Sequence, residues 1–171
     1  SYSLNLNQVV EYNLGYCYFK KQDYNTAIVY FRNFVNEEDK VNKNLLFDAY
    51  SKLGDCYFIL KQDEEAGIYY AKSAEINSDY ADYALYQQAR SYGLSQDYAK
   101  KSEILERLVS NYPKSNYYST SVFELGELNF SHLNNTDKSL KYFNRFIAEN
   151  PNNSKVSSAL INIGKIHLNT K

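Results

Sequence analysis

The sequence contains few of the residues on which several functional classes depend. Its 171 residues include two Cys, two His and six Gly, and they include no Met or Trp. No run approaches the roughly 18 apolar residues of a membrane-spanning helix. The glycines are scattered, so a glycine-rich phosphate loop is not expected. We therefore expect neither a membrane span nor a nucleotide site of that kind.

The sequence also lacks an excess of charge of either sign. Nineteen Lys and Arg balance twenty Asp and Glu, for a formal net charge of −1. A nucleic-acid-binding protein would need a basic face to contact phosphates. We expect no nucleic-acid partner.

What the sequence does contain is a repeat. A pair of residues recurs at steps of 39, 35, 37 and 38 residues. Its second member is Gly or Ala, and its first member is apolar in four of the five copies. The five copies are Leu14-Gly15, Leu53-Gly54, Gln88-Ala89, Leu125-Gly126 and Ile163-Gly164. A fixed period of this length is typical of stacked helical hairpins.

The second half of each unit carries its own signal. Ala27 and Ala66 lie twelve residues after Gly15 and Gly54, and a ring, Phe31 or Tyr70, follows four residues later. The fourth copy, with one inserted residue, has Ser139 and Phe143 at these places. A glycine inside a helix costs about 1 kcal/mol relative to Ala, so its recurrence needs a packing reason. We expect the small residue to lie where the two helices cross, beside the ring.

These offsets resemble those of the tetratricopeptide repeat family. The resemblance implies an all-α, right-handed superhelical solenoid of antiparallel helix pairs, with about four and a half repeats in a single domain over residues 1–171. The repeats are expected at 5–43, 44–78, 79–114 and 115–153, followed by a single helix at 154–169. That last helix lacks a partner in the sequence, so we expect a fragment of a longer array; the alternative is that this helix itself caps the array.

Helix boundaries can be assigned more finely. First helices are expected near 5–20, 44–61, 79–93, 115–132 and 154–169, and second helices near 24–37, 63–76, 97–111 and 136–149. Four polar residues that precede apolar periodic runs are candidate N-caps: Asp23, Asp63, Asp97 and Thr136.

The repeats with Pro113 and Pro151 at their ends resemble a longer-repeat subgroup. That subgroup includes bacterial cell-envelope proteins, such as the repeat lipoprotein of the outer-membrane β-barrel assembly machinery and the periplasmic coordinator of the Tol–Pal system. By this analogy a periplasmic or cell-envelope location is favoured over a cytoplasmic one.

The sequence offers few residues that could form a disulfide, a metal site or a catalytic site. Cys17 and Cys56 occupy the same position in adjacent repeats, about 10 Å apart, whereas a disulfide needs Cα atoms within ~7 Å. Buried free thiols are therefore expected. His132 and His167 fall at different repeat positions with no ligand pattern, so we expect no metal, no cofactor and no catalytic site.

A partner-binding surface is the remaining candidate function. In the resembled family, the inner wall is formed by first-helix residues three before and one after the glycine. These positions carry Tyr12, Tyr16, Ser51, Asp55, Tyr86, Arg90, Phe123, Glu127, Ile161 and Lys165. Exposed Tyr and Arg are typical of protein interfaces, so we expect a protein or peptide partner there.

Two alternatives stay open, together with the oligomeric state. Exposed tyrosines could form a module that binds glycans or other small ligands, or the array could regulate an enzyme domain elsewhere in a longer chain. The Lys and Asn pattern with which some family members clamp a chaperone's C-terminal carboxylate is absent at Tyr12, Tyr16, Ser51 and Asp55.

Overall fold

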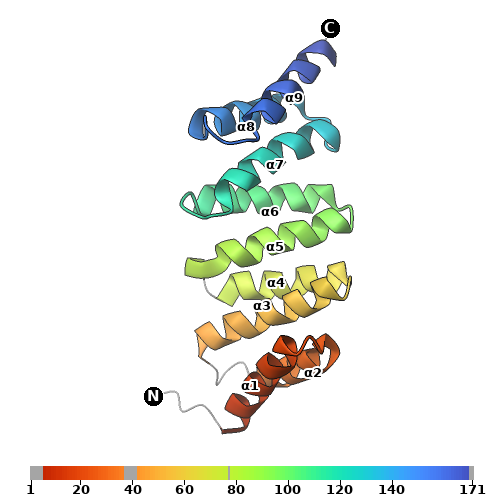
Figure 1. The fold of residues 1–171 in the computed structure, drawn as a ribbon, viewed down its shortest axis with the longest axis vertical. Helices are drawn as coiled ribbons and strands as arrows, with labels where there is room; N and C mark the ends of the chain where they lie inside the picture. The colour runs from red at the N-terminus through yellow and green to blue at the C-terminus, as the bar shows by residue number, and fades with distance from the viewer. Residues whose placement is uncertain (1–5, 37–41, 77, 170–171) are drawn as a thin grey trace. The chain divides into compact units, whose positions relative to one another are not determined.

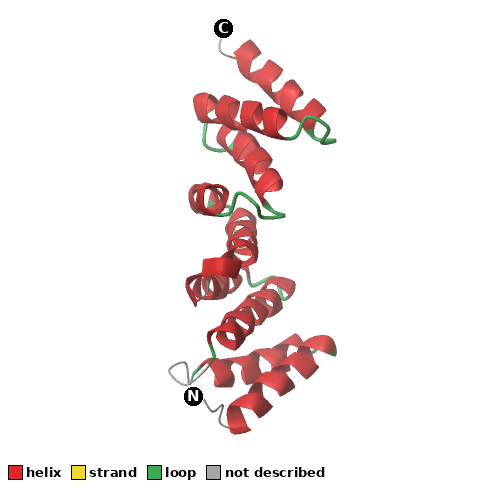
Figure 2. Ribbon diagram, turned by 90° about the vertical axis from the view of Figure 1, so that its left-hand side faces the viewer, coloured by secondary structure: helices red, strands yellow, loops and turns green. Residues whose placement is uncertain are grey.

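Helices form all the regular structure of the described residues, 6–36, 42–76 and 78–169, in a computed structural model (Figure 1). Figure 2 shows the helices in red and the described loops and turns in green. The predicted all-α class is confirmed. None of the helices in these ranges has the length and apolarity that crossing a bilayer requires. The chain divides into two compact units, Ser1–Ser95 and Gln96–Lys171, and the single domain expected over residues 1–171 stays a prediction.

The first unit contains five α-helices among its described residues. They are α1 (Leu6–Lys20), α2 (Tyr24–Val35), α3 (Lys43–Ile59), α4 (Asp63–Ile76) and α5 (Ala81–Leu94), with a 3₁₀ turn, η2 (Ser78–Tyr80), before α5. Each α-helix packs against the next one in sequence. This neighbour-to-neighbour packing is what stacked hairpins produce.

The second unit follows the same pattern. It contains α6 (Tyr98–Asn111), α7 (Tyr118–Ser131), α8 (Thr136–Glu149) and α9 (Val156–Asn169). Here α6 packs on α7, α7 on α8 and α8 on α9. The predicted helices lie within three residues of these bounds, except that the ends predicted at residues 5 and 37 fall outside the described residues.

Three first helices, α5, α7 and α9, begin two or three residues later than predicted. Residue 79 lies in η2, so α5 begins at Ala81. Ser115 is in the turn before α7, where its hydroxyl accepts a hydrogen bond from the Tyr117 amide at 3.0 Å. A side chain that bonds the backbone in this way favours a turn over a further helical residue.

Three of the five small residues of the repeat lie at helix crossings, as predicted, whereas a Cβ on Gly164 would meet nothing within 4 Å. A Cβ built on Gly15 would lie 2.8 Å from the Phe31 ring, and one on Gly54 would lie 2.6 Å from the Tyr70 ring. The same contact recurs in the second unit, where a Cβ on Gly126 would lie 2.7 Å from Phe143. These separations are shorter than real Cβ contacts, so only glycine lets each ring approach its facing helix this closely.

The hairpin turns use left-handed backbone at polar residues. Gln22, Lys61 and Asn134 have φ of 63°, 62° and 51°, and each lies between the two helices of a hairpin within one unit. In the first turn, the Asp23 amide donates to the Tyr18 carbonyl at 3.0 Å. Such bonds satisfy carbonyls that the end of a helix would leave unpaired.

Two of the four predicted N-caps are confirmed and two are wrong. The Asp23 carboxylate accepts from the Thr26 amide at 3.2 Å, and Asp97 accepts from Lys100 at 3.1 Å. Asp63 and Thr136 are instead the first residues of α4 and α8.

The shift by one residue has a simple cause in each wrong case. Gln62 occupies the cap position that Asp23 holds in the first hairpin, eight residues after the glycine. In the fourth hairpin, Asn135 is the cap, and its side chain accepts from the Lys138 amide at 3.1 Å.

The crossing geometry predicts the effect of one methyl group. We expect Gly54→Ala to lower the free energy of unfolding by about 1–3 kcal/mol, because its Cβ would overlap the Tyr70 ring. Chemical denaturation of the purified chain measures this change.

Gly67→Ala is the matched control in the same unit. A Cβ on Gly67 would meet its nearest atom, Cζ of Tyr92, at an ordinary 3.6 Å. It should leave stability unchanged or raise it, since Ala is the better helix former by about 1 kcal/mol. Equal losses in both variants would contradict the role assigned to the crossing.

Candidate functional site

The ten predicted surface residues lie on first helices of the repeats. In the first unit, α1 carries Tyr12 and Tyr16, α3 carries Ser51 and Asp55, and α5 carries Tyr86 and Arg90. In the second unit, α7 carries Phe123 and Glu127, and α9 carries Ile161 and Lys165. No contact described below joins residues of different units.

Tyr12 is held firmly and is only partly accessible. Its ring packs at a centroid distance of 5.2 Å from Phe34 and 6.1 Å from Phe31. Its hydroxyl donates to the Asp48 carboxylate at 2.6 Å, which links α1 to α3. Burial, followed by that carboxylate, raises the pKa of Tyr12, so the hydroxyl stays protonated as a donor. Tyr12 therefore stabilises the junction of the first two repeats.

Asp55 is the centre of a polar cluster between the second and third repeats. Its carboxylate accepts from the hydroxyls of Tyr70 at 2.8 Å and Tyr83 at 2.6 Å. Lys52 also pairs with it at 2.9 Å. Burial, and then the Asp55 charge, raises the pKa of Tyr70. Three donors from α3, α4 and α5 thus occupy the carboxylate, and little acceptor capacity remains for a partner.

Two predicted surface residues are buried, which corrects the prediction for them. Ser51 is only 3% exposed, because its hydroxyl lies 2.7 Å from that of Ser73 on α4. Phe123 is also only 3% exposed. Its ring packs on Phe143 and Phe146 of α8, and the ammonium of Lys155 lies 4.8 Å from its centroid.

Tyr16 and Arg90 are accessible. Tyr16 is exposed, and the Lys20 ammonium lies 5.2 Å from its ring centroid. The exposed Arg90 side chain lies over the ring of Phe58, with its guanidinium carbon 4.8 Å from the centroid. One Arg90 N–H donates to the Gln87 side chain at 2.9 Å. A guanidinium has five donors, so this arrangement orients Arg90 and leaves N–H groups for a ligand.

The second unit presents three of its four predicted residues. Glu127, Ile161 and Lys165 are exposed. Desolvation by its neighbours raises the pKa of the Glu127 carboxyl. Tyr86 of the first unit is half-buried.

Three residues that were not predicted from the sequence orient this surface. Lys52, Phe58 and Gln87 hold Asp55 and Arg90, and Lys52 also lies 5.0 Å from the ring of Phe19. The available signal was the spacing of three residues between Lys52 and Asp55 and between Gln87 and Arg90, which places each pair on one helix face.

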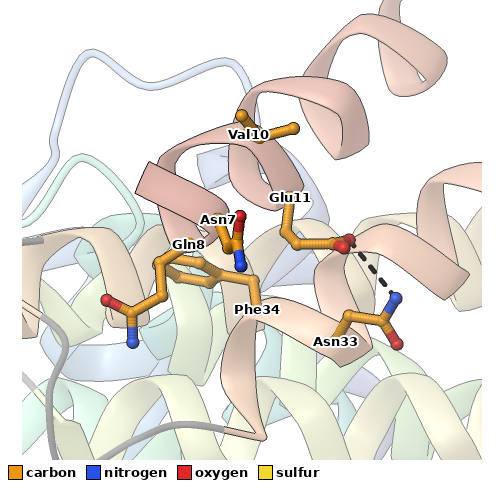
Figure 3. A pocket seen from close by; sticks show the side chains of 6 residues that line it. All are labelled: Asn7, Gln8, Val10, Glu11, Asn33 and Phe34. Atoms are coloured by element: carbon orange, nitrogen blue, oxygen red, sulfur yellow. Dashed lines mark hydrogen bonds between the residues drawn. The ribbon is translucent and has the colours of Figure 1, made fainter. Parts of the chain in front are cut away.

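A shallow hollow opens between α1 and α2 (Figure 3). Its volume is about 260 Å³, and it is lined by Asn7, Gln8, Val10, Glu11, Asn33 and Phe34. The Asn33 amide donates to the Glu11 carboxylate at 3.3 Å across it. Glu11 is the one titratable residue of this lining. No cluster of three metal-ligating side chains exists within the described ranges.

The two cysteines differ, contrary to the prediction that both are buried. Both are free thiols, but Cys17 is exposed whereas Cys56 is buried. In the first unit, α3 packs against both α2 and α4, whereas α1 packs mainly against α2. The equivalent positions of α1 and α3, which carry Cys17 and Cys56, are therefore packed against different numbers of neighbouring helices.

The Asp55 cluster predicts a coupled loss of stability. We expect Asp55→Ala to cost about 1–3 kcal/mol, because it leaves the buried Tyr70 hydroxyl without its acceptor. In a Tyr70→Phe/Tyr83→Phe background, the same substitution should cost much less. Urea unfolding of the four proteins measures the coupling, and equal costs in both backgrounds would refute it.

The cysteines predict two rates of thiol labelling. Cys17 should react with a maleimide in the folded chain, whereas Cys56 should react only after unfolding. Burial raises the pKa of Cys56 to about 12, so the thiolate is scarce even in mildly alkaline buffer. Mass spectrometry of a labelling time course tests this, with Cys17→Ser as the control that should remove the fast phase.

The sequence and structural comparisons agree on the type of repeat. Two tetratricopeptide repeat profiles match the chain, one over residues 10–39, 83–115 and 121–153 and the other over 47–80. No curated protein matches.

Solved structures match over most of their length. A crystal structure of MamA aligns with a TM-score of 0.72 and 17% identity, over 94% of this chain and 81% of that one. A putative kinesin light chain from Podosopora anserina gives 0.67 and 13%, over 97% and 88%. YrrB, described as a TPR protein with an unusual peptide-binding site, gives 0.66 and 18%, over 89% and 73%. At these identities the likeness concerns the fold, an all-α helical solenoid, and together with the profile matches it shows that this chain belongs to the tetratricopeptide repeat family.

Proposed function

We propose that the chain is a non-catalytic scaffold that binds a protein or peptide along the inner face of its repeats. The observation that carries this proposal is the pair of accessible anchors in the first unit, Tyr16 and Arg90, which occupy equivalent repeat positions. Tyr and Arg contribute strongly to interfaces because they combine large contact area with directed hydrogen bonds.

The polar groups of this face suggest the chemistry of the partner. Asp55 is occupied by its own tyrosines and Lys52, whereas Arg90 has N–H groups to donate. The face therefore offers donors and ring surface more than acceptors. An extended segment suits it, with backbone carbonyls accepting from Arg90 and an apolar side chain against Tyr16.

Pre-organisation supports binding at this place. Phe58 and Gln87 hold the Arg90 guanidinium, and Lys20 lies over the Tyr16 ring. A side chain that is already oriented loses less entropy when it binds. The peptide-binding site named for YrrB is a precedent in the same fold family, and it is a property of that protein.

The two alternative functions have less support. A glycan module would use Tyr12, Tyr16 and Tyr86 as stacking platforms. Tyr12 is already packed on Phe31 and Phe34 and bonded to Asp48, and Tyr86 is half-buried. No observation on these residues favours regulation of an enzyme domain. A place in a bacterial cell-envelope complex remains part of the proposal and rests on the resemblance of the Pro113 and Pro151 repeats to that subgroup.

The proposal predicts a separation of binding from folding. Tyr16→Ala with Arg90→Ala should abolish capture of a partner in pull-downs followed by mass spectrometry, while helicity and thermal midpoint stay unchanged. Titration of the captured partner should then show affinity weakened by about tenfold or more.

Val29→Ala with Ile68→Ala is the matched control. These side chains are exposed, at 56% and 52%, but lie on the second helices α2 and α4. They should leave capture intact. Equal loss of partner in both double variants, or loss of helicity with Tyr16 and Arg90, would contradict the proposed site.

A further inference from the structure

Two aliphatic side chains near Arg90 are open to solvent. Ile59, the last residue of α3, is 44% exposed, and Leu94, the last residue of α5, is 54% exposed. They occupy the same repeat position, five residues after Gly54 and Ala89. Neither α3 nor α5 is the first or last helix of the sequence, and α4 packs against both of them.

Arg90 brings these two positions together. Its guanidinium carbon lies 4.8 Å from the centroid of the Phe58 ring, so a side chain of α5 covers α3 at the residue before Ile59. Leu94 follows Arg90 by about one helical turn and therefore lies on the same side of α5. These four residues form one patch of the first unit, which we call the Arg90 patch. Exposed apolar side chains that gather at one place mark interaction sites, whereas scattered ones do not.

The positive charge of the Arg90 patch is not neutralised by the chain itself. Among the ion pairs of the described residues, none includes Arg90. Its guanidinium donates to the neutral side chain of Gln87. The Asp55 carboxylate of the same face is occupied by a lysine and two tyrosine hydroxyls. Glu64 and Glu65 are exposed but belong to a second helix, in the first turn of α4, where the helix dipole favours them. A negatively charged group of a partner would therefore complement the patch.

The surroundings of Arg90 favour a carboxylate as that group. The Phe58 ring lies against the planar guanidinium and leaves N–H groups at its edge. A carboxylate binds such an edge through two parallel hydrogen bonds. Phosphorylated segments are instead bound by clusters of Arg, and this patch contains a single one. An aliphatic neighbour of the carboxylate would exclude water and strengthen the charge pair.

We propose that the Arg90 patch selects an extended internal segment of a partner protein in which Asp or Glu stands beside Leu, Ile or Val. The carboxylate pairs with Arg90, and the aliphatic side chain contacts Ile59 and Leu94. This selection rests on the scaffold function proposed above, and it names the side chains that the scaffold recognises.

A second copy of the chain offers no such segment among its described residues. Outside the helices and η2, the acidic residues of the described ranges are Asp23 and Asp97. Each is an N-cap, and its carboxylate accepts an amide N–H of its own helix. Acidic side chains within the helices could join an extended segment only if the helix unfolded. A separate partner is therefore the better occupant.

Peptide display tests the selection. Phage that display short random peptides within a coat protein, and so without a free C-terminus, are panned on the immobilised 171-residue chain. The same library is panned on Arg90→Glu and on Arg107→Glu. Arg107 is the matched control, because it is an exposed arginine on a second helix, α6. Enriched peptides are then synthesised with both ends blocked, and fluorescence anisotropy measures their affinity for each chain.

The native chain should enrich peptides that carry Asp or Glu next to an aliphatic residue. Arg90→Glu should weaken their binding by about tenfold or more, because it places two like charges together. A peptide with Lys in place of its acidic residue should regain affinity for the Arg90→Glu chain. Arg107→Glu should leave binding unchanged. Ile59→Ser with Leu94→Ser should remove the aliphatic preference and keep the acidic one, and circular dichroism should show native helicity in every variant.

The possible failures are distinguishable. Enriched peptides without an acidic and aliphatic preference, which still lose binding to Tyr16→Ala with Arg90→Ala, would overturn the selection and leave the scaffold function standing. Acidic peptides that bind Arg90→Glu as tightly as the native chain would also overturn the selection. So would self-association of the chain in sedimentation that Arg90→Glu abolishes, because a second copy would then occupy the patch. If no peptide distinguishes the native chain from Tyr16→Ala with Arg90→Ala, the scaffold function is contradicted as well.

Discussion

The contact between a glycine and an aromatic ring is the constraint on which the hairpins α1–α2, α3–α4 and α7–α8 depend. At Gly15, Gly54 and Gly126 the facing ring occupies the space where a Cβ would be, with separations of 2.6 to 2.8 Å. Each buried ring removes roughly 150–250 Å² from water, and it can do so between two helices only where one helix has no side chain. The spacing of 16 or 17 residues from each glycine to its ring follows, because each of these hairpins must bring its ring back to its own glycine. The rest of each hairpin is arranged around that crossing.

Hydrogen bonds between neighbouring helices fix how the helices align within this apolar packing. Tyr12 with Asp48, and Tyr83 with Asp55, join helices of neighbouring repeats, and the Ser139 hydroxyl donates to the Gly126 carbonyl at 2.8 Å within its own hairpin. The same bonds decide which groups remain for a partner. Asp55 and Tyr12 are used internally, whereas Tyr16 and Arg90 are held in place and accessible. The proposed binding face therefore consists of the first-helix side chains that stay accessible once their neighbours have formed bonds within the fold.

The helices and three of the glycine crossings were predictable from the sequence, and the exact caps and the burial of individual first-helix side chains were not. The helices and the glycine crossings are set within about 30 residues, so periodicity and spacing were sufficient to place them. The exact caps were missed by one residue at Asp63 and Thr136, because the sequence offers two adjacent polar candidates at each turn. Ser51 is buried against Ser73 of α4, and Phe123 is buried against Phe143 and Phe146 of α8. The family pattern for the inner wall does not specify these contacts. Cys17 and Cys56 have the same sequence context, and only the packing around α1 and α3 separates them.

A double-mutant cycle on Gly126→Ala and Phe143→Leu in unfolding experiments tests the central contact most directly, since Phe143 has no hydroxyl to complicate the comparison. If the added methyl group is costly because it overlaps the ring, Gly126→Ala should be destabilising in the native chain and nearly neutral once Phe143 is Leu. The coupling between the two sites would then be about 1 kcal/mol or more. Additive losses in the double variant would show that the glycine is required for another reason, and would contradict the account of the fold given above.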